Sequence, residues 1–162
     1  MKKLINRGST GEKGATAVEF ALIMPIFFLL LFGIIDFGWY FFNQHTIQFA
    51  TREGTRLALV GGIIKDDQGN DMTREESIIR TIKDNAAVAV NPDALRISIY
   101  PVGADYSDPA DWQTTVNAGN GGDYMRVRVL YTYHFLTPLI GSLIPAGVNE
   151  IRAEGLYRNE LF

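Results

Sequence analysis

The sequence predicts an α+β fold in which one long N-terminal helix packs on a small antiparallel sheet with one further helix. Three observations predict it. An apolar stretch occupies residues 20–42, a helix-capping signature stands at residues 73–76, and three later segments alternate apolar and polar residues. We expect three regions: a basic leader (residues 1–14), a transmembrane and stem helix (15–60), and an α+β head (61–162).

The apolar stretch is long enough to cross a membrane. As an α-helix, residues 20–42 measure about 35 Å, and a bilayer core is about 30 Å thick. Asp36 is the one charged residue in the stretch and is either a simple interfacial residue or a functional one. Basic residues precede the stretch, which predicts a cytoplasmic N-terminus and an extracytoplasmic head: Lys2, Lys3, Arg7 and Lys13.

Two simpler export signals fit this N-terminus less well. A secretory signal has a shorter apolar region that ends at small residues, whereas this stretch ends in Trp39, Tyr40 and further aromatics. An uncleaved anchor explains the length and the flanking charges but not Glu19. A carboxylate at the start of a membrane helix is unfavourable in free energy unless it is paired, so Glu19 indicates a functional role.

Two motifs carry a family resemblance. Glu19 is the fifth residue after Gly14, which closes the basic leader as in type IV prepilins, within the segment G-A-T-A-V-E-F-A-L-I-M-P. The stretch A-T-R-E-G-T-R-L-A follows the membrane segment and contains Arg52, Glu53, Gly54 and Arg56. Together these segments resemble the TadE-like family, the pilin-like subunits of Tad (Flp) pilus systems, over roughly residues 14–60.

The resemblance implies how the N-terminus is used. A prepilin peptidase of the inner membrane would cleave between Gly14 and Ala15. The resemblance assigns Glu19, Phe20 and Pro25 to assembly, with Glu19 neutralising the terminal amine of a neighbouring subunit in an apolar bundle. It implies four kinds of partner: the prepilin peptidase, other Tad pilins and pseudopilins, the inner-membrane assembly platform and membrane lipid.

The helix is expected to continue beyond the membrane as a stem. After the membrane segment no Pro or Gly pair interrupts it up to residue 60, and Gly61-Gly62 is a fitting stop. Pro25 predicts a local kink, or is simply tolerated within a membrane helix. Arg52 and Arg56 lie four residues apart, so they either share an acidic partner or form a solvated face. The stripe predicted to face the head comprises Ile47, Ala50, Gly54, Leu57 and Ala58.

The head is expected to contain one helix and three strands. Thr73 and Glu76 form a capping box that opens a helix ending near residue 90. Residues 95–100, 124–135 and 149–158 read as half-buried strands, with cross-strand Arg–Glu pairs on the outer face. The alternation predicts that the following side chains point to solvent: Arg96, Ser98, Tyr100, Arg126, Arg128 and Thr132.

Two connections in the head are distinctive. Residues 105–123 are rich in Asp and Asn, which are calcium-type ligands, but their spacing fits no EF-hand and turn chemistry explains the same residues, so we predict no metal site. Residues 136–147 are too apolar to lie free in water. They either fill the core of the head or dock on another subunit or on the membrane surface.

The composition argues against catalysis. The chain has no Cys, two His without convincing partners, no phosphate-binding glycine loop and a net charge of -3 without a basic cluster, so we expect no catalytic residue, no cofactor and no nucleic-acid partner. The preferred interpretation is a TadE-type minor pilin or pseudopilin acting in Tad/Flp pilus assembly and adhesion. The alternatives are an uncleaved, membrane-anchored ligand-binding domain, or a pseudopilin of another type IV or type II secretion system.

Overall fold

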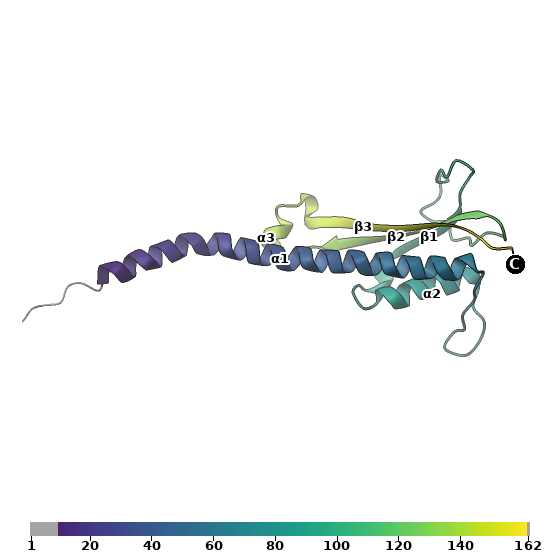
Figure 1. Ribbon diagram of the computed structural model, residues 1–162, viewed down its shortest axis with the longest axis horizontal. Coiled ribbons are helices and arrows are strands. Elements are labelled where there is room, and N and C mark those ends of the chain that lie inside the picture. Colours follow the sequence, from purple (N-terminus) through teal and green to yellow (C-terminus); the bar gives the residue numbers. More distant parts are fainter. Residues whose placement is uncertain (1–9, 162) are drawn as a thin grey trace, which may run out of the picture.

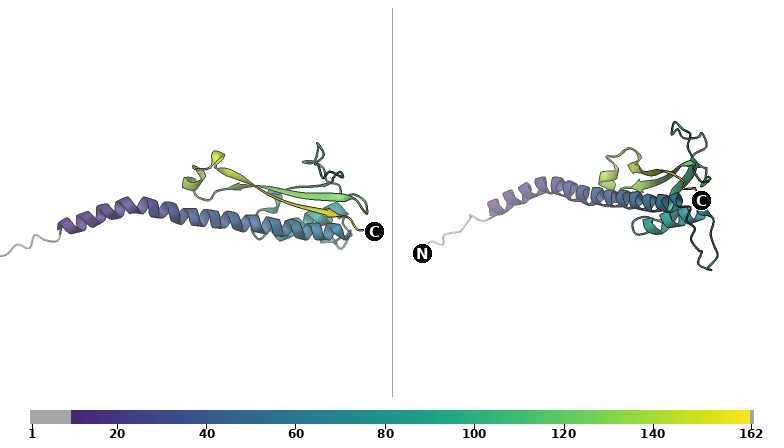
Figure 2. Two further views of the ribbon diagram at one scale, coloured as in Figure 1. Left: turned by 45° about the horizontal axis from the view of Figure 1, so that its top comes forward. Right: turned by 45° about the vertical axis from the view of Figure 1, so that its right-hand side comes forward.

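The fold is that of a long helix with a small head packed along its second half (Figures 1 and 2). A computed structural model describes the backbone of residues 10–161 and the side chains of residues 14–161 apart from 139 and 146. Helix α1 (Thr10–Leu59) is continuous and therefore begins within the predicted leader. Leader residues 1–9, including Lys2, Lys3 and Arg7, lie outside the described residues. The predicted α+β class is confirmed.

One antiparallel sheet forms the upper layer of the head. Strands β1 (Arg96–Pro101), β2 (Tyr124–His134) and β3 (Val148–Arg158) pair in the order β1-β2-β3. Ser98, Arg128 and Glu154 lie opposite one another across the three strands. Two short helical turns, α3 (Pro138–Gly141) and η2 (Pro145–Gly147), lie between β2 and β3. The three predicted strands are confirmed to within two residues at each end.

Helix α2 (Arg74–Ala86) forms the lower layer of the head beside α1. The predicted capping box is present: Thr73 accepts from Glu76 N, and Glu76 accepts from Thr73 N. The predicted end near residue 90 was wrong, because the chain leaves the helix after Ala86 through a turn. A 3-10 turn, η1 (Pro92–Ala94), then leads to β1, and proline disfavours helical geometry in the residue before it.

The core lies between the two helices and the inner face of the sheet. Ile47, Ala50 and Ala58 of α1 are buried as predicted, while Leu57 is only half-buried. Helix α1 comes very close to its neighbours at two glycines. A Cβ on Gly54 would lie 2.4 Å from Ile82 Cγ1 of α2, and one on Gly155 would lie 2.4 Å from Thr55 Oγ1.

The stem helix ends as its sequence predicts. Gly61 has a φ of 65° and donates to the carbonyl of Ala58, and Gly62 donates to the carbonyl of Leu57. This pair of bonds is the Schellman arrangement, which glycine favours because positive φ strains other residues. The C-terminal segment adds a further bond from Glu160 N to the carbonyl of Leu59, and so fixes the end of the stem to the sheet.

The outer face of the sheet departs from the prediction. Ser98, Tyr100 and Arg128 were expected to point to solvent, but they are 4%, 0% and 2% exposed. The connection between β1 and β2, residues 102–123, folds back over this face. It pairs with β1 through a bond from Ile99 N to the carbonyl of Thr115. Strict alternation therefore identified the strands correctly but not what covers them.

Candidate functional site

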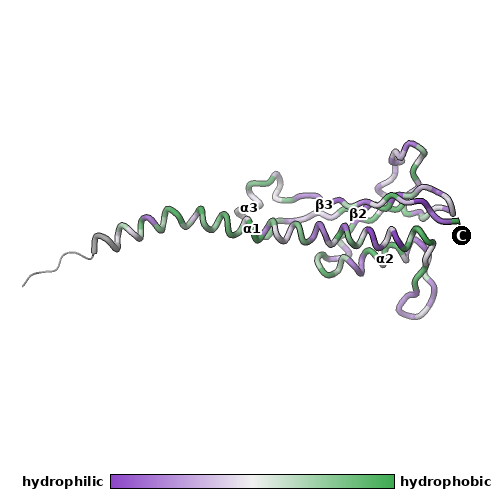
Figure 3. Tube along the Cα trace, viewed as in Figure 1, coloured by the Kyte–Doolittle hydropathy of each residue, from purple (hydrophilic) through white to green (hydrophobic). Residues whose placement is uncertain are grey.

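The free part of α1 is apolar and open on all sides. From residue 14 to residue 32 every side chain is exposed, among them Phe20 at 60% and Leu22 at 70%. Figure 3 shows the apolar character of this segment, and α1 is long and apolar enough to cross a membrane. Exposed apolar surface of this extent is unfavourable in water. The helix is compatible with a single-pass membrane anchor.

The predicted processing and assembly residues all lie on this free helix. Gly14 and Ala15 are exposed, and a Cβ added at Gly14 would meet no atom within 4 Å. Glu19 is also exposed, and none of the ion pairs among the described residues includes it. Pro25 lies within the continuous helix, and Figure 1 shows that α1 bends in the N-terminal part that contains it.

The four residues of the predicted stem motif separate into inward and outward positions. Gly54 is buried against α2, whereas Arg56 is exposed and pairs with Glu53 at 3.3 Å. Arg52 takes part in none of the ion pairs found among the described side chains. Arg52 lines a polar groove of about 330 Å³ between α1 and β3, together with Arg152 and Glu154. Arg52 and Arg56 therefore share no acidic partner among the side chains that the structure describes.

Asp36 forms the junction between the free part of α1 and the head. Its side chain is fully buried. Leu136 N donates to Oδ1 at 2.7 Å, and Thr137 N donates to Oδ2 at 3.1 Å. The Thr137 hydroxyl also donates to Oδ2, and the Tyr133 hydroxyl donates to the Asp36 carbonyl at 3.3 Å. Asp36 thus fixes the start of the connection between β2 and β3, residues 135–147.

An aromatic cluster surrounds this junction. Tyr40 of α1 contacts Tyr133 edge-on at 5.2 Å between ring centroids and stacks on Phe135 at 6.3 Å. Burial, together with the nearby Asp36 carboxylate, raises the pKa of Tyr133 to about 12, so this hydroxyl stays protonated. The sequence indicated Asp36 as unusual but did not indicate its partners, which lie about a hundred residues along the chain.

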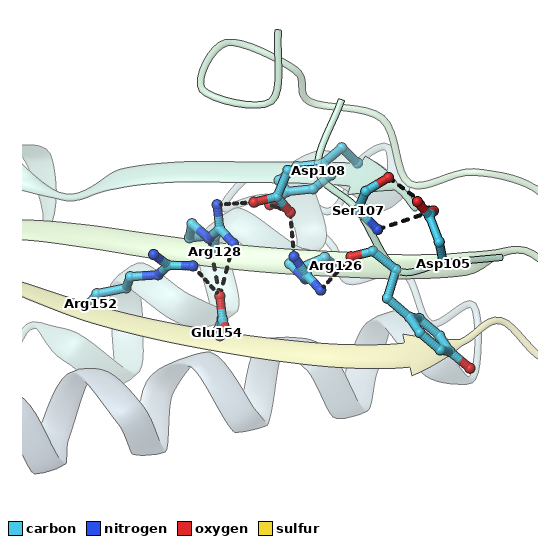
Figure 4. Close-up of polar contacts among 9 residues, drawn as sticks. Asp105, Ser107, Asp108, Arg126, Arg128, Arg152 and Glu154 are labelled. Atoms are coloured by element: carbon cyan, nitrogen blue, oxygen red, sulfur yellow. Dashed lines mark hydrogen bonds and ion pairs between the residues drawn. The ribbon is translucent and has the colours of Figure 1, made fainter. Parts of the chain in front are cut away.

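Arg128 organises the opposite end of the head (Figure 4). It donates to Asp108 Oδ2 at 2.8 Å and to Glu154 Oε2 at 3.0 Å, and its guanidinium lies 4.2 Å from the ring centroid of Trp112. Burial works against ionisation of Asp108, but hydrogen bonds from Arg128 and Tyr100 outweigh it and hold the Asp108 pKa below its ordinary value. Asp108 and Trp112 belong to the 102–123 connection, so Arg128 ties this connection to the sheet.

Three of the four acidic residues of the 102–123 connection have local partners. Asp105 accepts from the Ser107 hydroxyl, Asp123 accepts from Asn120 N, and Asp108 binds arginines. Within the described part of the chain, no three His, Cys, Asp or Glu side chains are grouped as a metal would require. His45 and His134 are both exposed. The carboxylates that resemble calcium ligands in sequence act here as turn and ion-pair residues.

A second exposed apolar surface lies outside the predicted membrane segment. Phe49 is 48% exposed and Val88 is 73% exposed, and both line a groove of about 530 Å³ between α1 and the end of α2. Phe42, 43% exposed, continues this groove toward the free part of α1. The stem therefore presents an apolar face on the side of α1 away from the sheet.

Comparison with known proteins gives one match. The family model described as TadE-like protein matches residues 14–56, which comprise the free part of α1 and most of the stem. No curated protein and no solved structure matches the chain. The match contains Gly14, Glu19 and the stem motif, the features on which the sequence resemblance rests. The resemblance to the TadE-like family is therefore confirmed over residues 14–56.

Proposed function

We propose that the chain is a TadE-type minor pilin or pseudopilin that takes part in the assembly and adhesion of a Tad (Flp) pilus. The observation that carries this proposal is the family match over residues 14–56, within which a free apolar helix continues directly into a stem that carries a folded head. In this proposal α1 anchors the protein in the inner membrane with its N-terminus cytoplasmic, and the head lies outside the cytoplasm.

Processing would remove residues 1–14 and leave Ala15 as the new N-terminus. A peptidase binds its substrate in an extended form, and Gly14 lowers the local stability of the helix by about 1 kcal/mol relative to alanine. The positive amine at Ala15 would then lie one helical turn from Glu19. In an apolar bundle a carboxylate and an amine from adjacent subunits would each supply the charge that the other needs.

The stem contributes surfaces for assembly partners in the same proposal. Arg52, which has no ion pair among the described side chains, suits an acidic residue of another subunit. The exposed Phe42 and Phe49 suit the apolar stem of a neighbouring pilin. Partners of these kinds are expected among other Tad pilins, pseudopilins and the assembly platform.

The mass of the protein from its native membrane tests the processing step. We expect an N-terminus at Ala15. A Gly14→Leu variant is the matched control. A Cβ at this exposed position would meet no atom within 4 Å, so retained precursor would report a failure of cleavage rather than of folding. Wild-type protein that keeps Met1 or Lys2 in cells with a functional prepilin peptidase would contradict the proposal and favour an uncleaved anchor.

Glu19 provides the test of assembly. We expect Glu19→Ala to be cleaved normally but to be absent from sheared filaments and from complexes with other pilins. Glu150→Gln is the control, because Glu150 is an exposed carboxylate on the head. Normal incorporation of the Glu19→Ala protein would remove the charge-pairing role, and co-purification of the wild type with sheared filaments would place it in the pilus itself.

A further inference from the structure

The connection between β2 and β3 lies beside the membrane helix rather than over the core of the head. Ile140 of α3 is buried, and its Cδ1 lies 3.8 Å from where a Cβ on Gly33 of α1 would be. Figure 1 shows α3 against α1 at the end of the head nearest the free helix. At the same time Leu136 and Leu143 of this connection are 56% and 66% exposed. Packing on the chain itself, one of the alternatives that the sequence left open, is therefore only partial.

The exposed side of this connection forms one wall of an apolar groove. The groove has a volume of about 430 Å³, and Leu143 and Ile140 line it opposite residues of α1 that include Leu30 and Phe37. It is continuous with the exposed apolar surface of the free part of α1. Whatever covers that part of α1 therefore also reaches the groove.

Helix length sets the depth of this connection in a bilayer. If the hydrocarbon core begins at Phe20, just after the charged Glu19, its thickness of about 30 Å corresponds to about 20 residues and ends near Trp39. Asp36 then lies about 4.5 Å inside the outer boundary and Gly33 about 9 Å inside it, at about 1.5 Å per residue. Interfacial apolar segments reach about 5 to 10 Å into a leaflet, which is the same depth.

Many backbone N–H groups of this connection are hydrogen-bonded within the protein, which suits a position away from water. Non-helical backbone at membrane depth is tolerated only where its polar groups are satisfied by the protein. Asp36 accepts from the N–H groups of Leu136 and Thr137, and Pro138 and Pro145 have no N–H. The following residues each donate to a carbonyl of the same connection: Gly141, Ser142, Leu143, Ile144 and Gly147.

From these observations we infer a second membrane contact in addition to α1: residues 136–147 insert into the outer leaflet of the bilayer, with Leu136 and Leu143 among the acyl chains. The inference rests on the proposed membrane anchoring of α1. Asp36 has a defined role in it, because this carboxylate lies in the apolar region and binds the inserted backbone instead of water. Two attachment points then fix the orientation of the head relative to the membrane.

Site-specific fluorescence tests this contact. The chain contains no Cys, so single-cysteine variants of the full chain can be labelled with an environment-sensitive fluorophore and reconstituted into vesicles of phosphatidylethanolamine and phosphatidylglycerol. Leu143→Cys is the test position. Ile26→Cys, 63% exposed on the free helix and outside the groove, is the control for membrane insertion. Gln113→Cys, exposed on the 102–123 connection, is the control for solvent.

We expect label at residue 143 to emit at shorter wavelength than label at residue 113 and to lose fluorescence to quenchers on lipid acyl chains, as label at residue 26 does. Solvent-like emission at residue 143 with quenching at residue 26 would overturn the inference and leave the anchor intact. Solvent-like emission at residue 26 as well would overturn both the inference and the proposed membrane anchoring of α1. A blue shift at residue 143 that grows with the protein-to-lipid ratio and resists lipid quenchers would assign the groove to a second copy of the chain and overturn the lipid contact.

Discussion

The two long connections of the sheet are each held by one buried charged residue, but by opposite means. Near the free helix, the Asp36 carboxylate binds the 135–147 connection through neutral N–H and O–H groups alone. At the far end, the Arg128 guanidinium binds the 102–123 connection through carboxylates and the face of Trp112. The first arrangement buries a charge among dipoles, and the second buries it in an ionic cluster.

The difference follows from what surrounds each charge. Glu154 and Asp108 keep 46% and 26% of their side chains exposed, so water still stabilises the carboxylates that neutralise Arg128. Asp36 lies between an apolar helix and an apolar connection, where a second charge would have to be buried as well. Neutral donors satisfy a carboxylate there without a second desolvation cost. The two ends of the head are therefore built for different surroundings.

Replacement of Asp36 should have the largest effect. Asp36→Ala leaves three donors of the 135–147 connection without an acceptor. We expect the free energy of opening this connection to fall by at least about 4.5 kcal/mol, since hydrogen bonds to charged groups contribute roughly 1.5 to 3 kcal/mol each. Hydrogen exchange of the full chain in nanodiscs measures this loss at Gly141 to Ile144. Asp93→Ala, an exposed carboxylate, is the control. Unchanged hydrogen-exchange protection in Asp36→Ala would show that Asp36 does not hold the 135–147 connection in place.

Replacement of Arg128 should have a smaller effect. Breaking a buried ion pair costs about 3 to 5 kcal/mol, and the partial exposure of its carboxylates reduces our expectation for Arg128→Met to about 2 to 4 kcal/mol. Urea unfolding of the full chain in detergent, followed by Trp112 fluorescence, measures it. The matched control is Arg152→Met, because Arg152 contacts the same Glu154 at 2.8 Å but is 51% exposed. Equal losses in the two variants would show that burial is not decisive.

Acidification should loosen the 102–123 connection at the far end of the head. The pKa of Asp108 is held below its ordinary value of 3.8, so its stabilising contribution is complete above that value and is lost as the pH falls toward the lowered one. Hydrogen bonds from Arg152 and Arg128 outweigh burial and lower the pKa of Glu154 in the same way. Hydrogen exchange across residues 102–123 should accelerate below about pH 4 in the wild type. Arg128→Met should show a weaker dependence.

The sequence predicted the helices and strands better than it predicted which segments cover them. The helix cap at Thr73, the stop at Gly61 and the three strands follow from local chemistry, and the structure confirms them. Burial of Arg128 was missed because it depends on Trp112 and Asp108, which reach it from an irregular connection without periodicity. A large aromatic among turn residues was the one signal available. Cleavage at Gly14 and the role of Glu19 remain predictions.

The smallest effect is expected for the pair formed by Arg96 and Glu150, which also lies on the outer face of the sheet. Its nitrogen–oxygen distance of 2.6 Å is shorter than that between Arg128 and Glu154, but its side chains are 60% and 52% exposed. Exposed pairs contribute little because water screens them and ordering long side chains costs entropy, so a double-mutant cycle should give a coupling of about 0.5 kcal/mol or less. The same cycle for Arg128 and Glu154 should give a larger value. Similar couplings would mean that the short distance, rather than burial beneath residues 102–123, determines the strength of ion pairs on this sheet.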